Sequence, residues 1–213
     1  MATGAVGALA EVRDTDGTWR GVSGVAELGT TRPVPAAGRF RAVSITKTFV
    51  ATVALQLVDE GRLRLDDTVE KWLPGVVPDG DHITLRQLLN HTSGVYDYRR
   101  TLPMPPGPEF LVNRWRTWTA GELVRRAVAE APTFEPPGSA YSYANTGYVL
   151  LGQIIEEATG RAYGEEIERR IIRPLRLRGT SLPGTSPRID GPHPRGYVPI
   201  ERATGHTSSS TRR

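Results

Sequence analysis

The chain has 213 residues, of which 38% are hydrophobic and 23% are charged, so it can bury a core as one large domain or two small ones. The net charge of +4 is spread along the chain without a concentrated basic stripe, which argues against nucleic-acid binding. Cysteine is absent, which excludes disulfides and thiolate metal sites. No stretch approaches the roughly 18 apolar residues of a membrane span, and the first ten residues lack the basic flank and apolar core of a signal peptide.

The N-terminal region is predicted to form a β-hairpin. Residues 5–13 and 18–28 have the pattern of two strands, and Asp14-Thr15-Asp16-Gly17 between them favours a tight turn.

A long helix is expected to start near Arg39, run to about Glu60 and end at Gly61, a residue that suits a left-handed C-terminal cap. This segment is apolar nearly all round, which is typical of a helix in the centre of a protein. Its first turn nevertheless carries Ser44 and Lys47, three residues apart and therefore on one side. Burying a lysine beside a serine costs free energy, so we expect the pair to have a function.

Shorter helices follow. Capping boxes at Thr84–Gln87 and Thr119–Glu122 predict helices over residues 85–90 and from 120 to about 131. Between them, the proline-rich residues 101–109 are expected to be an irregular loop.

Asn145 is well suited to cap a helix over residues 146–158, with Gly160 at its end. Residues 165–172 are predicted to form the last helix, which Pro174 stops. From Pro183 onward the pattern fades, and nothing is expected to complete a sheet.

These expectations divide the chain into three parts. Residues 1–43 would contribute the hairpin to an α/β domain, and residues 44–200 would form a helical region carrying the nucleophile helix and the Tyr-x-Asn loop. Residues 201–213, which end in a Ser- and Thr-rich stretch of low complexity, are predicted to be a disordered tail.

Ser44 and Lys47 permit nucleophilic catalysis. A serine hydroxyl becomes a good nucleophile only when a neighbouring base takes its proton. At a helix N-terminus, the dipole favours developing negative charge and the Ser44 N–H can bind an oxyanion. Lys47 can accept the Ser44 proton if burial lowers its pKa, or it can stay charged and hold a nearby phenolate.

Tyr143 and Asn145 offer the remaining chemistry at a turn before a helix. The Tyr143 hydroxyl can exchange protons with Ser44 and with a leaving amine, and the Asn145 amide can orient Lys47 or a substrate amide. Taken singly, Tyr143 is better explained as a buried aromatic residue with a satisfied hydroxyl, and Asn145 as a simple helix cap, because both are common.

Four motifs occur in order along the chain and together are similar to one enzyme family. They are Phe40-Arg41-Ala42-Val43-Ser44-Ile45-Thr46-Lys47, Leu57-Val58-Asp59-Glu60-Gly61-Arg62-Leu63, Leu88-Leu89-Asn90-His91-Thr92-Ser93-Gly94, and Pro137-Gly138 through Tyr143-Ala144-Asn145-Thr146-Gly147-Tyr148. Over roughly residues 4–200 the chain resembles the class C β-lactamase / D-alanyl-D-alanine carboxypeptidase family, in particular its secreted Streptomyces DD-carboxypeptidase branch.

The resemblance implies a mixed α/β (α+β) fold of the serine β-lactamase/DD-peptidase type and assigns roles to four residues. Ser44 would be the acylated nucleophile, Lys47 its partner, and Tyr143 the general base and acid. Asn145 would bind substrate and contact Lys47. His91 would belong to a structural turn and have no catalytic role.

The resemblance also implies the partners. We expect a small-molecule or peptidoglycan-peptide substrate, with β-lactams as inhibitors or substrates, and no cofactor, metal or nucleic acid. The spacing of the other three histidines does not suit metal ligation. An extracytoplasmic location is expected, although the chain shows no signal peptide.

The sequence departs from the family in two ways. Ala144 stands where serine is more usual, which we expect to matter little. The family's third motif, Lys-Thr-Gly or His-Thr-Gly on a later strand, is not found, and Gly205-His206-Thr207-Ser208 is interpreted as a coincidence. The chain is therefore expected to be a clipped, C-terminally truncated member that lacks the last strands of the sheet.

Two functional hypotheses follow. The first is a serine hydrolase that forms an acyl-enzyme at Ser44 and cleaves a D-Ala-D-Ala peptide, a β-lactam or a simple ester. The second is a truncated, non-catalytic member that acts at most as a binding protein.

Overall fold

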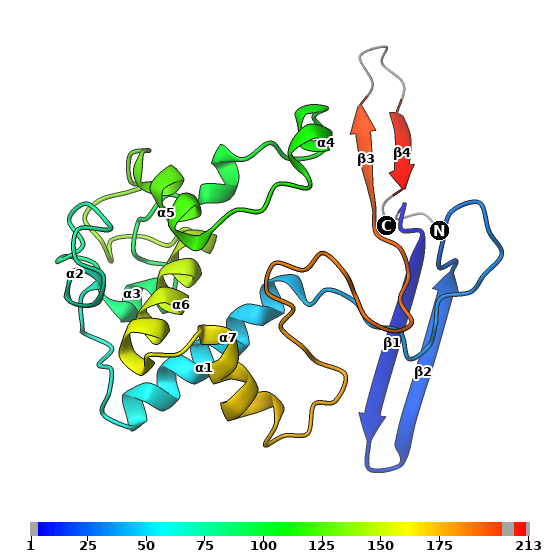
Figure 1. The fold of residues 1–213 in the computed structure, drawn as a ribbon, viewed down its shortest axis with the longest axis horizontal. Coiled ribbons are helices and arrows are strands. Elements are labelled where there is room, and N and C mark those ends of the chain that lie inside the picture. The colour runs from blue at the N-terminus through cyan, green and yellow to red at the C-terminus, as the bar shows by residue number, and fades with distance from the viewer. Residues whose placement is uncertain (1–3, 202–206, 212–213) are drawn as a thin grey trace. The chain divides into compact units, whose positions relative to one another are not determined.

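A computed structural model describes residues 4–201 and 207–211 of the chain (Figure 1). The chain divides into two compact units. The first comprises Met1–Ala42, Pro103–Trp115 and Thr185–Arg213, and the second comprises Val43–Leu102 and Arg116–Gly184. The three-part division predicted above remains a prediction.

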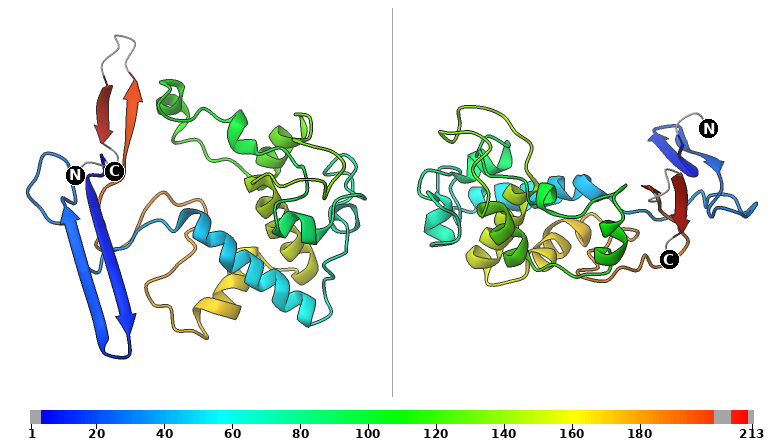
Figure 2. Two further views of the ribbon diagram at one scale, coloured as in Figure 1. Left: turned by 180° about the vertical axis from the view of Figure 1, so that it is seen from behind. Right: turned by 90° about the horizontal axis from the view of Figure 1, so that it is seen from above.

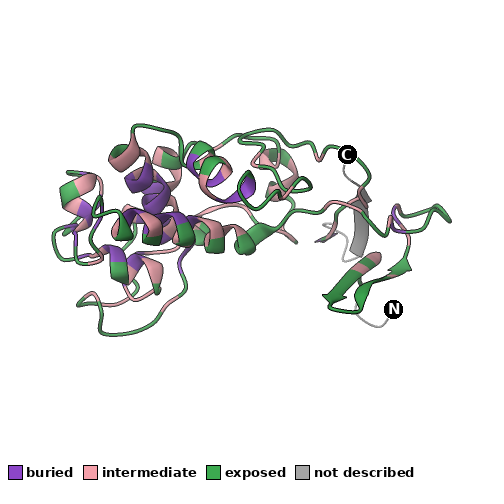
Figure 3. Cartoon of the chain, turned by 90° about the horizontal axis from the view of Figure 1, so that it is seen from below, coloured by how far each residue is buried: buried purple, intermediate pink, exposed green. Residues whose placement is uncertain are grey.

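The first unit contains the predicted hairpin. Strand β1 (Gly7–Asp14) pairs antiparallel with β2 (Gly17–Gly24), and Thr15 and Asp16 form the loop between them. The Asp14 carboxylate accepts hydrogen bonds from the N–H groups of Asp16 and Gly17, and Gly17 has a φ of +145° that favours glycine. The hairpin prediction is confirmed, and the strand residues are exposed almost throughout (Figure 3).

The same unit contains a second strand pair that the sequence did not predict. Strand β3 (Tyr197–Glu201) pairs antiparallel with β4 (Thr207–Thr211). Pro199 interrupts the strand pattern of β3, and the Ser/Thr run of β4 has no apolar alternation, so neither segment carried a sequence signal. The expected disordered tail over 201–213 thus includes a paired strand, while residues 202–206 and 212–213 lie outside the described residues.

The second unit is helical. Its long helices are α1 (Thr46–Asp59), α5 (Ala120–Val128) and α6 (Asn145–Thr159). Its short elements are the 3₁₀ turns η1 (Val43–Ile45) and η2 (Tyr98–Thr101), the helices α2 (Val69–Trp72), α3 (Leu85–Leu89) and α7 (Tyr163–Ile167), and the π turn η3 (Glu168–Ile172). One further short helix, α4 (Glu109–Asn113), belongs to the first unit and falls partly in the predicted irregular loop.

The local signals that predicted helix ends are borne out. Both capping boxes are formed, at Thr84 with Gln87 and at Thr119 with Glu122. Gly61 and Gly160 follow helices α1 and α6 in the left-handed conformation, each with a φ of +69°.

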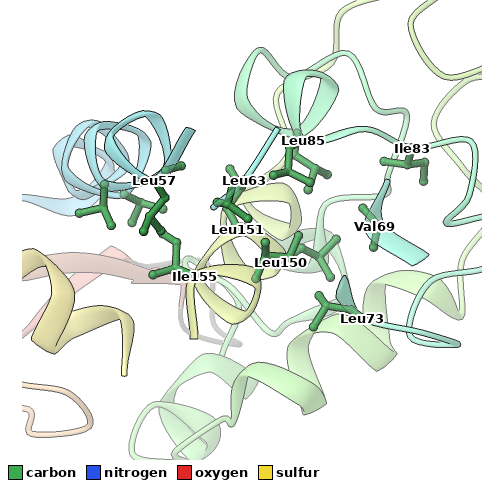
Figure 4. Close-up of a cluster of buried hydrophobic side chains, with 14 of the residues drawn as sticks. Leu57, Leu63, Val69, Leu73, Ile83, Leu85, Leu150, Leu151 and Ile155 are labelled. Atoms are coloured by element: carbon green, nitrogen blue, oxygen red, sulfur yellow. The ribbon is translucent and has the colours of Figure 1, made fainter. Parts of the chain in front are cut away.

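The helix at the centre of this unit is α6, whereas the sequence pattern had indicated the helix carrying Ser44. Helix α6 packs against α1, α2, α3, α5 and α7 (Figure 2). Leu57 of α1 lies beside Ile155 of α6 in a cluster that also contains Leu150 and Leu151 (Figure 4). Helix α1 buries one face in this cluster, and Leu55 on another face is 49% exposed.

Candidate active site

The residues with predicted chemistry all belong to the helical unit, so its internal packing determines their geometry. Ser44 lies in the 3₁₀ turn η1, directly before α1. The helix begins at Thr46 and not near Arg39 as predicted. Val43 explains the difference, because its φ of +48° lies in the left-handed region and interrupts the helical path. Such a conformation is strained for a β-branched residue, and strained backbone concentrates at functional sites.

The structure brings together all four candidate side chains. The Ser44 Oγ lies 2.8 Å from the Tyr143 hydroxyl oxygen, and the Lys47 ammonium donates to Ser44 Oγ at 3.3 Å. Lys47 also donates to Asn145 Oδ1 at 2.7 Å. Lys47, one turn after Ser44 on α1, therefore connects the nucleophile candidate to the start of α6.

The segment after α3 holds Tyr143 in place. The N–H of Ser142 donates to the His91 carbonyl at 2.9 Å, and the N–H of Gly138 donates to the Thr92 carbonyl at 2.7 Å. The His91 ring stacks on the Tyr143 ring with 4.4 Å between their centroids, and His91 Nδ1 accepts the Ala144 N–H at 3.4 Å. His91 is thus part of a structural turn, as the resemblance implied, and in addition contacts the candidate base directly.

The surroundings of Tyr143 favour its phenolate. Burial raises the pKa of the phenol, but the Lys47 ammonium and the Ser44 hydroxyl more than compensate, so the pKa lies below the usual value of about 10. The Lys47 Nζ lies 5.0 Å from the centre of the Tyr143 ring, close enough for its charge to stabilise a phenolate.

His91 is held in its neutral form. Burial lowers the pKa of its imidazole below 6.5, and the nearby Lys47 charge lowers it further. A neutral ring retains the lone pair with which Nδ1 accepts the Ala144 N–H.

Asn145 does not cap α6, which corrects the prediction. It is the first helical residue, the N-cap is Ala144, and the α6 N-terminus has no cap from its own side chains. The Asn145 amide is engaged elsewhere, because Oδ1 accepts from Lys47 and Nδ2 donates to both carboxylate oxygens of Asp97.

Sequence reasoning missed Asp97. The residue directly precedes the turn η2, whose Arg99 N–H it accepts at 3.2 Å, so its sequence position indicates only an ordinary cap. Its role at Asn145 depends on a contact between residues 48 positions apart, and no local pattern signals such a contact.

Two further features were not found in the described part of the chain. Among residues 4–201 and 207–211, no group of three or more His, Asp or Glu side chains is arranged to hold a metal ion. None of the helices described there has the length and apolar character needed to cross a membrane. In the sequence resembling the third motif, Gly205 and His206 lie outside the described residues.

Comparison with known proteins identifies the family. The Beta-lactamase family profile matches residues 1–203. The chain belongs to the Beta-lactamase family. Its relatives in this family include penicillin-binding proteins, an esterase and amidohydrolases, and these are serine hydrolases.

Three similar proteins show the extent of the similarity. Penicillin-binding protein 4* of Bacillus subtilis is 34% identical over 163 residues, which are 75% of this chain and 34% of that protein. The crystal structure of a D-stereospecific amidohydrolase from Streptomyces sp. is 45% identical, with a TM-score of 0.85 over 96% of this chain and 59% of that one. D-amino acid amidase from Ochrobactrum anthropi SV3, complexed with L-phenylalanine, is 33% identical, with a TM-score of 0.78 over 92% of this chain and 54% of that one.

These similarities confirm the predicted family and the predicted mixed fold class. The chain spans less than two thirds of the length of each of these three proteins.

Proposed function

We propose that the protein is a serine hydrolase that forms an acyl-enzyme at Ser44 and cleaves an amide bond next to a D-configured residue. The observation that carries this proposal is the 2.8 Å contact between Ser44 Oγ and the Tyr143 hydroxyl, with the Lys47 ammonium beside both residues. A nucleophile in contact with a base, and a cation that favours the ionised base, are two of the features that acyl transfer needs.

The acylation step uses Tyr143 as the base. Ser44 Oγ attacks the carbonyl carbon while its proton moves to the Tyr143 phenolate, and Lys47 remains an ammonium ion. The C–N bond then breaks, and the leaving amine takes the proton from Tyr143. Lys47 is the less favoured base, because its distance to Ser44 Oγ is 3.3 Å against 2.8 Å for Tyr143.

In deacylation, water is the nucleophile and Ser44 Oγ is the leaving group. Water attacks the ester carbonyl as Tyr143 takes its proton, and the proton then returns to Ser44 Oγ as the ester bond breaks. The proposal also keeps the expected contact of Asn145 with substrate, and the Asn145 amide is held between Lys47 and Asp97.

The proposal of a D-configured substrate rests on two proteins of similar structure. The amidohydrolase and the amidase described above are named for D-stereospecific and D-amino acid substrates, and the first shares 45% of its aligned residues with this chain. A peptide ending in D-Ala-D-Ala belongs to the same chemical class, as does the β-lactam that mimics it. This proposal includes β-lactam binding and the extracytoplasmic location that the resemblance implied.

Hydrolysis of matched enantiomers tests the proposal. D-phenylalanine amide and L-phenylalanine amide would be incubated separately with the protein, and the free amino acid would be measured by chromatography. We expect release from the D enantiomer only, and none with Ser44→Ala. Equal release from both enantiomers would overturn the stereochemical part, and release that survives Ser44→Ala would overturn the role of Ser44.

A second function is the non-catalytic binding protein. Binding of a D-amino acid amide, detected by calorimetry without any hydrolysis, would support this alternative.

A further inference from the structure

The Asn145 side chain lies between two groups of opposite hydrogen-bonding character. On one side the Lys47 ammonium donates to Oδ1 at 2.7 Å. On the other side Asp97 accepts from Nδ2, at 3.2 Å through Oδ1 and 3.0 Å through Oδ2. An ammonium can only donate and a carboxylate can only accept, so only one orientation of the amide satisfies both neighbours.

The reversed orientation would be repelled twice. A flipped amide would place its NH₂ group against the Lys47 ammonium and its carbonyl oxygen against the Asp97 carboxylate. Asn145 is buried, so solvent offers little compensation for these two contacts. The carboxylate of Asp97 is therefore what selects the orientation in which Asn145 accepts from Lys47.

Asp97 is itself well fixed. Its Oδ1 also accepts the backbone N–H groups of Asn145 and Arg99, both at 3.2 Å. The first of these bonds serves the N-terminus of α6, which has no side-chain cap of its own. The same carboxylate thus holds the backbone and the side chain of Asn145, while making no described hydrogen bond to Ser44, Lys47 or Tyr143.

We propose that Asp97 is a positioning residue that fixes the Asn145 amide with Oδ1 toward Lys47 and so keeps the Lys47 ammonium in contact with Ser44. This inference rests on the proposed function, because its consequence is the rate at which Ser44 is acylated. Asp97 does not touch the reacting atoms and acts through Asn145 and Lys47.

The substitution Asp97→Asn separates orientation from capping. The asparagine side chain keeps an acceptor oxygen for the backbone N–H groups of Asn145 and Arg99. If Asp97 served only as a cap, the substitution would therefore have little effect. The new NH₂ group, however, faces Nδ2 of Asn145, and a flip of Asn145 would turn its own NH₂ toward Lys47. Either arrangement leaves two donors facing each other.

The exchange of the two side chains supplies the rescue. In Asp97→Asn/Asn145→Asp, the carboxylate at position 145 accepts from Lys47 on one side and from the new amide at position 97 on the other. Every donor again faces an acceptor. Asp81→Asn is the matched control, since Asp81 is exposed and makes no described contact with the site.

The experiment measures the acylation rate constant with benzylpenicillin by quenched-flow mass spectrometry, together with the melting temperature. For Asp97→Asn we expect at least a tenfold slower acylation at a melting temperature within a few degrees of the parent. The exchange variant should be acylated faster than Asp97→Asn, and Asp81→Asn should match the parent. Parent-like acylation by Asp97→Asn would overturn the proposal.

A second readout does not depend on turnover. The NMR signals of the Asn145 side-chain NH₂ group are assigned by their loss in Asn145→Asp. The protons of this group should exchange slowly with solvent in the parent and quickly in Asp97→Asn. A parent that is never acylated would contradict the proposed function while leaving this orientation test intact. Fast exchange in the parent would contradict the role of Asp97 alone.

Discussion

At the scale of single residues, the Tyr143 hydroxyl is the group on which the proposed chemistry depends most. Tyr143→Phe removes it and keeps the ring that stacks on His91. We expect acylation to slow by about 10²- to 10⁴-fold, the usual contribution of a general base. Single-turnover kinetics would measure the loss, with Tyr163→Phe on α7 as a control of the same chemical change. Acylation by Tyr143→Phe within threefold of the parent would assign the base role to Lys47.

The lowered pKa of Tyr143 also predicts a pH profile. Because the phenolate is the active form, acylation should rise with pH and level off above the Tyr143 pKa, at a pH below 10. The rate would be measured from pH 6 to pH 10 in the parent and in Tyr143→Phe. The rising limb should vanish in the variant, and a limb that persists unchanged would show that another group titrates.

His91 predicts a dependence of stability on pH. Its folded pKa lies below the unfolded value of about 6.5, so the unfolded state binds more protons between the two values. The neutral ring therefore contributes stability above pH 6.5, and this contribution is lost as the pH falls through the folded pKa. The melting temperature of the parent should fall more steeply from pH 7.5 to pH 5 than that of His91→Phe. Parallel curves would mean that the pKa of His91 is the same in the folded and unfolded states, which would contradict the lowered folded pKa.

At the scale of elements, a buried carboxylate joins the last turns of the helical unit to α1. Glu166 of α7 is fully buried and is paired with Arg169 and Arg170 of η3, while Arg170 also pairs with Glu60 at the end of α1. Burial raises the pKa of Glu166, but the two guanidinium groups outweigh this effect and the pKa lies below its usual value. The carboxylate is therefore ionised at neutral pH and compensates the charge of Arg170.

Removing this charge should be costly. Glu166→Gln leaves Arg170, whose side chain is 9% exposed, with one carboxylate partner fewer, and we expect a loss of about 3 kcal/mol in the free energy of unfolding. Glu168→Gln, in the next turn and paired with the exposed Arg173, should cost less than about 1 kcal/mol. Urea unfolding measures both variants, and equal losses would contradict the assignment of Glu166 as the buried link.

Two leucines of helix α1, one buried and one exposed, allow the contribution of the core to stability to be tested. Leu57 is fully buried against α6, whereas Leu55 on the same helix is 49% exposed. We expect Leu57→Ala to lower the free energy of unfolding by about 3 kcal/mol and Leu55→Ala by about 1 kcal/mol or less. A larger loss for Leu55→Ala would show that a further part of the protein covers this face of α1.

At the scale of the whole molecule, the sequence predicted what local chemistry determines. Thr84 and Thr119 marked helix starts because their capping boxes involve residues three apart, and Asp14 and Gly17 marked the hairpin turn for a similar reason. The grouping of Ser44, Lys47 and Tyr143 was expected from ordered motifs and the family resemblance, since no local rule brings residues 99 positions apart into contact.

The features that were missed depend on partners distant in sequence or on unusual backbone. Asn145 was taken for a cap because its bonds to Lys47 and Asp97 are tertiary contacts. The early helix start near Arg39 was wrong because nothing in the sequence signals a positive φ at Val43. The centre of the helical unit is α6 because five other helices pack on it, which the composition of α1 alone did not indicate.

The central claim is that Ser44 is an assembled nucleophile, and the mass of the intact protein tests it most directly. The protein and its Ser44→Ala variant would be incubated with benzylpenicillin, and circular dichroism would verify that both are folded. We predict a mass gain of one benzylpenicillin molecule in the parent, located at Ser44 by peptide mapping, and no gain in the variant. A folded parent that gains no mass, or a variant that gains the same mass, would contradict the account.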